Sequence, residues 1–235
     1  MEETVARLIE VVNRREPAQI VTGNPIMVMA ALEDERYYRA MASADLIVPD
    51  GAGVVWAANY VGEPVTERVA GFDLLHRLMT VGESKRWRVF LLGSSQEVVD
   101  EAAARLGRQF PLVTLVGARN GYFDASEDAQ VIAEVRAAQP DLLFVARAAS
   151  NQEPWIAEHK AALGVPLVMG VGGSFDIIAG KLKRAPLLMR KLKLEWFYRL
   201  LKQPSRLPRM LVLPKFALKV IRERKMVLNP HGSSK

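Results

Sequence analysis

The sequence predicts an α/β fold in which helices flank a parallel sheet, followed by a basic helical appendage at the C-terminus. Over the first 180 residues, short and continuously apolar segments alternate with longer segments of helical periodicity. Strands that are apolar at every position are typical of parallel sheets covered by helices on both faces. Beyond that point the periodicity stays helical, but lysine and arginine become frequent. We therefore expect a body over residues 1–180 and an appendage over residues 181–235.

The expected elements follow from apolar spacing and from the residues that interrupt it. Strands are expected at 19–22, 45–48, 88–92, 112–116, 142–145 and 166–169. Helices of the body are expected at 4–14, 25–42, 71–82, 95–109, 125–138 and 152–163. In the appendage, apolar side chains alternate with bases over 186–202 and 209–225, which predicts two further helices separated by Pro204 and Pro208.

The charge of the chain is unevenly distributed. Residues 181–235 contain 16 lysines and arginines but only two acids, Glu195 and Glu223, so their net charge is +14, whereas residues 1–180 carry −8. A segment this basic binds polyanions, either nucleic acid or a bilayer with anionic lipids. Basic helices with an apolar stripe fit a membrane interface, although helices that only pack on the body show the same pattern. Because the bases are mixed with Leu, Trp and Phe, a membrane is favoured over nucleic acid.

Composition excludes several classes of protein. Without cysteine the chain has no disulfide, no thiolate metal site and no thiol nucleophile. Its three histidines do not have the spacing of metal ligands, so we expect neither a metal site nor a cofactor. No apolar run reaches the length of about 18 residues that a membrane-spanning helix needs, and the acidic N-terminus does not resemble a signal peptide. From these two observations we expect a cytoplasmic protein. P-loop and nucleophile-elbow motifs are also absent, which disfavours a P-loop NTPase and a hydrolase of that type.

Candidate site residues follow the first two expected strands. Ligands of open α/β sheets bind beyond the carboxyl ends of the strands, so residues there are the first to consider. Thr22 and Asn24 follow the first strand, and Asp50 follows the second, before glycines that permit close approach of a ligand. Simpler interpretations are that Asn24 only caps a helix and that Asp50 only forms a turn.

Later strand ends offer further candidates for substrate binding. Gly93 precedes a helix start that suits a phosphate, and Arg147 places a cation after the fifth strand. Gly172 and Gly173 favour close approach of a nucleotide, with tight strand–helix packing as the alternative. Arg68 either pairs with a phosphate or with a neighbouring acid.

A series of motifs occurs in a fixed order along the chain. They are Thr-x-Asn, Val-Pro-Asp-Gly-x-Gly, Glu-Arg-Val-Ala-Gly-Phe-Asp-Leu, Gln-Glu-x-Trp-Ile, Val-Gly-Gly-Ser-Phe-Asp-x-Ile-Ala-Gly, Lys-Arg-Ala-Pro, Leu-Glu-Trp-Phe-Tyr-Arg-Leu and Pro-x-Arg-x-x-Arg-Met. With this series the chain resembles the bacterial WecG/TagA/CpsF glycosyltransferases over about residues 1–222. The resemblance implies a Rossmann-like body and an appendage that meets the membrane and completes the active site.

The resemblance also implies an activity. The family transfers N-acetylmannosamine or a related sugar from a UDP-sugar, with inversion and without a metal. The acceptor is a polyprenyl-diphosphate-linked sugar of GlcNAc type at the inner face of the cell membrane. The products feed teichoic acid, common antigen, capsule or exopolysaccharide. The enzyme is expected to be peripheral on the membrane, to bind no nucleic acid, and to form homo-oligomers in solution.

By the same resemblance, individual residues acquire expected roles. Asp50 is expected to act as general base, with Thr22 and Asn24 positioning the substrate beside it. Three arginines of the appendage are expected to close over the diphosphate, namely Arg199, Arg206 and Arg209. Gln152, Gly172 and Gly173 match positions that line the nucleotide-sugar pocket in the family. Together with the candidates named above, the expected substrate-binding set is Arg68, Gly93, Arg147, Gln152, Gly172, Gly173 and Asp176.

The chain departs from the family's pattern in the loop after the fifth expected strand. Relatives usually carry a Pro and a Lys within the segment that here reads Ala148–Asn151, and Arg147 replaces an apolar residue, which suggests that its charge stands in for the lysine. Ile26 stands where the family often has an acid, and the chain starts inside its first helix, without the short strand that usually precedes it. The altered Ala148–Asn151 loop motivates a second hypothesis, a non-catalytic, membrane-bound family member. A nucleic-acid-binding protein that uses the basic appendage is the third.

Overall fold

Six parallel strands form the centre of the computed structural model, which describes residues 1–192 and 194–228. The strands are β1 (Ala18–Gly23), β2 (Leu46–Pro49), β3 (Arg88–Gly93), β4 (Thr114–Arg119), β5 (Leu142–Ala146) and β6 (Leu167–Gly170). They pair in the order β2-β1-β6-β5-β3-β4. The predicted α/β fold with a parallel sheet is thereby confirmed, because every expected strand is present within a few residues of its expected position.

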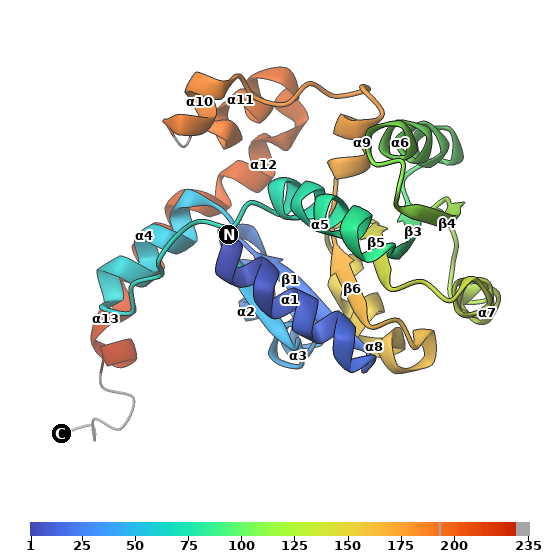
Figure 1. The fold of residues 1–235 in the computed structure, drawn as a ribbon. Helices are drawn as coiled ribbons and strands as arrows, with labels where there is room; N and C mark the ends of the chain where they lie inside the picture. Colours follow the sequence, from blue (N-terminus) through green and yellow to red (C-terminus); the bar gives the residue numbers. More distant parts are fainter. Residues whose placement is uncertain (193, 229–235) are drawn as a thin grey trace.

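Helices cover both faces of the sheet (Figure 1). One face packs against α1 (Glu2–Arg14), α5 (Gly71–Lys85), α6 (Gln96–Gln109) and α9 (Ser174–Ile178). The other packs against α2 (Pro25–Glu33), α3 (Glu35–Ala42), α7 (Asp128–Ala138) and α8 (Gln152–Leu163). Successive side chains of a strand point to opposite faces, so in β3 Val89 joins the first core cluster and Phe90 the second. This two-sided burial explains why the central strands β5 and β6 are apolar at every position.

Near β2 one expected helix is wrong and one helix was missed. The single helix expected over 25–42 is two helices, because Asp34 has an extended backbone at the end of α2. Its carboxylate then caps α3 by accepting the N–H groups of Arg36 and Tyr37, at 2.8 and 3.2 Å. A helix over Ala52–Val61, α4, was not expected. Its apolar residues surround the whole helix, so they show no stripe of helical spacing.

The C-terminal region is helical, as predicted, but more divided than expected. It contains α10 (Leu187–Lys191), α11 (Glu195–Lys202), a short 3₁₀ turn (Pro204–Arg206), α12 (Leu207–Met210) and α13 (Val212–Leu228). Prolines remove backbone donors and so shorten the helices. The last of these, α13, runs along α4 (Figure 1). Phe216 of α13 is buried near Gly53. The division at residue 180 stays a prediction, and residues 229–235 of the expected appendage lie outside the described residues.

Candidate active site

The candidate site lies where the carboxyl ends of β1 and β2 meet. In the register of these two strands Thr22 faces Val48 and Gly23 faces Pro49. Asp50 follows immediately, and its backbone N–H donates to the Gly23 carbonyl at 2.8 Å. The parallel pairing therefore brings the segment 22–24 and Asp50 to one edge of the sheet, although they are distant in sequence.

The Asp50 carboxylate is held from two sides. Its Oδ2 accepts the backbone N–H of Gly71, the first residue of α5, at 3.0 Å. Its Oδ1 accepts from Arg68 Nε at 3.4 Å. Burial raises the pKa of Asp50, the Gly71 and Arg68 donors oppose this, and the nearby Glu195 carboxylate adds to it. The net result is a carboxylate whose pKa lies above its usual range, which suits a group that must accept a proton.

Thr22 and Asn24 lie beside this carboxylate. A Cβ built on Gly71 would lie 3.1 Å from Thr22 Oγ1, so the start of α5 packs directly on the threonine. Asn24 is the N-cap of α2, and its Oδ1 accepts the N–H groups of Ile26 and Met27 at 3.0 and 3.2 Å. The capping interpretation of Asn24 therefore describes its oxygen, while its amide N–H groups are the donors that it can offer to a substrate.

A buried acid of the C-terminal region joins this site. Glu195, at the start of α11, is 8% exposed. Its Oε2 lies 3.1 Å from Arg68 Nη2, and its Oε1 lies 3.4 Å from Arg199 Nη2 and 4.0 Å from Arg184 Nε. Arg68 thus links Asp50 of the body to Glu195 of the C-terminal helices. Sequence reasoning missed Glu195, although an acid in so basic a segment was a usable signal.

Arg206 lies near the loop that follows β6. Burial lowers its pKa, the charges of Arg199 and Arg209 lower it further, and Asp176 opposes them. Asp176 belongs to α9, directly after the Gly172–Gly173 turn. A Cβ on Gly172 would meet no atom within 4 Å, so this turn borders open space. Arg206 therefore feels the charges of Arg199, Arg209 and Asp176, and this excess of positive charge favours binding of an anion.

Comparison with known proteins identifies the family. A model of the glycosyl transferase WecG/TagA/CpsF family matches residues 1–229. The chain belongs to this family. It is also 37% identical to a protein of Bacillus spizizenii named N-acetylglucosaminyldiphosphoundecaprenol N-acetyl-beta-D-mannosaminyltransferase, over 91% of this chain and 82% of that one.

Two further relatives have the same name. The relative from Bacillus subtilis is 36% identical over 88% of this chain and 80% of its own length. The relative from Staphylococcus aureus strain MW2 is 35% identical over 88% of this chain and 81% of its own length. Because the chain belongs to the family over nearly all its length, it is a glycosyltransferase of N-acetylmannosaminyltransferase type.

Gln152, Gly93 and Arg147, which were predicted to bind substrate in this glycosyltransferase, contact other groups of the protein itself. Gln152 is buried, and its Oε1 accepts the backbone N–H groups of Gly172 at 3.0 Å and Arg147 at 3.3 Å. It thereby ties the loop after β5 to the loop after β6. At Gly93 a Cβ would lie 2.2 Å from the Ala146 carbonyl oxygen, so close strand packing accounts for the glycine.

The Arg147 side chain contacts two aromatic rings in the second core cluster. Its guanidinium lies 3.9 Å from the centroid of Phe123 and 5.3 Å from that of Trp155, and Nη2 donates to the Phe123 carbonyl at 2.8 Å. Burial lowers its pKa. In this conformation the guanidinium is held by groups of the protein, and its expected role as a substitute for the lysine stays a prediction.

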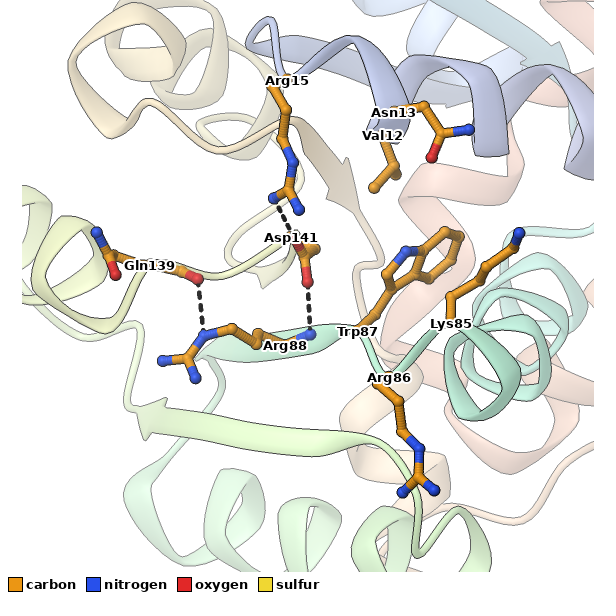
Figure 2. A pocket seen from close by; sticks show the side chains of 9 residues that line it. All are labelled: Val12, Asn13, Arg15, Lys85, Arg86, Trp87, Arg88, Gln139 and Asp141. Atoms are coloured by element: carbon orange, nitrogen blue, oxygen red, sulfur yellow. Dashed lines mark hydrogen bonds and ion pairs between the residues drawn. The ribbon is translucent and has the colours of Figure 1, made fainter.

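A hollow lies at the amino-terminal edge of the sheet, opposite the edge that carries Asp50 (Figure 2). Its volume is about 650 Å³, and it is rich in bases. Arg15 and Arg86 directly follow α1 and α5, and Arg15 pairs with Asp141. Arg88 donates to the carbonyls of Ala138 and Gln139 at the end of α7, at 2.8 and 3.0 Å. Since cations at helix C-termini compensate the helix dipoles, these bases stabilise the fold, and we assign the hollow no substrate.

Among the described residues, His, Asp and Glu side chains nowhere gather in groups of three that could hold a metal ion. Over residues 1–192 and 194–228, none of the helices combines the length and apolarity that a membrane crossing needs.

Proposed function

We propose that this glycosyltransferase moves N-acetylmannosamine from a UDP-sugar to an N-acetylglucosamine linked to a polyprenyl diphosphate. The product would enter a cell-surface polymer such as wall teichoic acid. The observation that supports this most is the Asp50 carboxylate, held by Arg68 and the Gly71 N–H at a strand end, in a chain whose relatives have this activity in their names.

In the proposed reaction Asp50 is the general base. The acceptor hydroxyl oxygen attacks the anomeric carbon of the donor as its proton passes to Asp50. A new glycosidic bond forms while the bond to the UDP oxygen breaks on the opposite side, so the anomeric configuration inverts. The raised pKa of Asp50 supports this assignment, because a more basic carboxylate is a better proton acceptor.

The leaving UDP gains negative charge that must be stabilised. We assign this to Arg206, which lies near Asp176 of α9, and to Arg199 and Arg209, whose charges act on Arg206. Fixed cations aimed at a developing charge lower the barrier without reorganisation. In this proposal the arginines do what a metal does in other transferases, so the reaction is independent of a metal and of any cofactor.

The direct test is a donor and acceptor assay. Purified protein is incubated with UDP-N-acetylmannosamine and a lipid-diphosphate-N-acetylglucosamine analogue, and released UDP is measured. We expect acceptor-dependent release of UDP that is unaffected by a metal chelator. Absence of release with this donor and with other UDP-sugars would reject the activity and leave the non-catalytic hypothesis.

The pH profile of this reaction tests the base. Asp50 must be deprotonated, so kcat/KM falls as the pH drops through its pKa, and that fall should lie above about 4, the ordinary aspartate value. The Glu195 carboxylate raises the pKa of Asp50, so Glu195→Gln should move the acidic limb to lower pH. Glu223→Gln, which changes the other acid of residues 181–235, serves as control and should not move it. An unmoved limb in the Glu195 variant would contradict the assignment.

We also propose that the C-terminal helices bind the cytoplasmic face of the membrane. Most of the large apolar side chains that the described residues leave exposed are in this region, among them Leu188, Trp196 and Leu218. Flotation with vesicles should show binding that requires anionic lipid, weakens with salt and decreases in the variant Leu188→Ser. Binding to DNA but not to vesicles at matched salt would favour the nucleic-acid hypothesis instead.

A further inference from the structure

A second cationic hollow adjoins the candidate site. It lies between the start of α5 and α10 and has a volume of about 320 Å³, at the lower end of the range of about 300–1000 Å³ for small-molecule sites. Its charged lining comprises four cations and two carboxylates, from Arg68, Asp73, Arg184, Arg190, Lys191 and Glu195. The lining is therefore positive overall and suits an anion.

Two arginines of this hollow have N–H groups that make no hydrogen bond within the described residues. Within the described residues, the Nε atoms of Arg184 and Arg190 are buried without a hydrogen-bond partner. Arg184 is fixed, because its Nη2 lies 2.7 Å from Asp73 and its guanidinium lies 4.5 Å from the centroid of the Phe72 ring. Buried donors without partners are unfavourable, and an anion beside these guanidinium groups would offset the charge that protein groups leave uncompensated.

The place of the hollow relates it to the reaction. Arg68 lines it and also contacts Asp50, so the hollow is one side chain away from the proposed base. Of the arginines assigned to UDP, Arg206 lies near Asp176, whereas Arg199 contacts Glu195 in the lining of the hollow. An enzyme that transfers a sugar from a nucleotide diphosphate to a lipid-diphosphate-linked sugar must hold two diphosphates. Arg206 near Asp176 offers one cationic site, and the bases of this hollow offer another.

Apolar side chains indicate which diphosphate belongs here. Leu187 lines the hollow and is 57% exposed, and Leu188 and Leu192 on the same segment are 68% and 58% exposed. The ribose next to the phosphates of a nucleotide is polar and gains nothing from contact with exposed leucines. In a lipid diphosphate, an apolar chain is attached directly to the phosphates and can contact these leucines. We propose that the hollow lined by Arg184, Arg190 and Lys191 binds the diphosphate of the lipid-linked acceptor, an inference that rests on the proposed function.

The test uses the double variant Arg190→Gln/Lys191→Gln and a water-soluble, short-chain prenyl-diphosphate-N-acetylglucosamine, without vesicles. We expect the acceptor KM to rise about tenfold or more through loss of charge-assisted hydrogen bonds, with the donor KM unchanged. Replacing the diphosphate of the acceptor by a monophosphate should weaken the wild type but not the variant further. Lys183→Gln, an exposed lysine outside the hollow, is the matched control.

Other results would overturn the assignment. An unchanged acceptor KM, or a rise in the donor KM instead, would exclude the hollow as the acceptor site. A defect seen only with vesicles would assign the bases to the bilayer surface. If the double variant does not fold, Lys191→Gln alone tests the same point, because Lys191 is exposed.

The outcome is separable from failure of the proposed function. If the wild type releases no UDP, calorimetric titration with a short-chain prenyl diphosphate still tests the hollow. Binding by the wild type that is lost in the double variant would support the site, and absence of binding by the wild type would overturn it.

Discussion

Asp50→Asn is expected to lower kcat by about a hundredfold to ten-thousandfold, the usual contribution of a general base. The amide oxygen of asparagine can still accept the Gly71 N–H, so the local structure at the start of α5 should persist. What the variant loses is the ability to take the proton of the acceptor hydroxyl. UDP release at saturating donor and acceptor measures kcat, and thermal unfolding checks the fold.

The chain offers a matched control for this variant. Asp45 precedes β2 at the amino-terminal edge of the sheet, whereas Asp50 follows the same strand at the carboxyl edge. The Asp45 carboxylate accepts the Gln19 N–H at 2.8 Å and pairs with Lys160 at 2.7 Å. Asp45→Asn should therefore affect stability slightly and turnover not at all. If both variants turn over like the wild type, Asp50 is not the base.

The strands of this protein could be predicted because their burial is visible in the local sequence, as short runs of apolar residues. The central strands β5 and β6, covered on both faces, are apolar at every position, and β1, β2, β3 and β6 end at a glycine or a proline. Helices without a single buried face show no apolar stripe of helical spacing in the sequence, which is why α4 was missed. The break at Asp34 was missed for another reason: capping depends on the backbone conformation of one residue, and the flanking helices share compatible periodicity.

The candidate site could be predicted only in part, for a similar reason. Asp50, Thr22 and Asn24 follow strand ends, so the topology alone brings them together. The contact of Glu195 with Arg68 joins residues 127 positions apart in the sequence, and no periodicity connects them. Gln152 shows the reverse case, since the motif drew attention to it but its polar atoms bind the protein itself. Sequence patterns thus located the strand ends, whereas the side-chain partners required the packed structure.

Arg206→Ala is expected to lower kcat by about a hundredfold to a thousandfold, the usual cost of losing one preorganised group that stabilises transition-state charge. The reason lies in the arrangement of like charges. Arg206 is half-buried, and both its burial and the charges of Arg199 and Arg209 disfavour its ionised form. Such a cluster is costly in the empty enzyme, and the cost is offset when a diphosphate binds.

Activity and stability should therefore respond in opposite directions. Without ligand, Arg206→Ala should unfold at the same temperature as the wild type or higher, because repulsion within the cluster is relieved. Addition of UDP should raise the unfolding temperature of the wild type much more than that of the variant. Lys202→Ala removes an exposed base from the neighbouring helix α11 and should change neither turnover nor the effect of UDP. If UDP stabilises the Arg206 variant as strongly as the wild type, this arginine does not bind the leaving diphosphate.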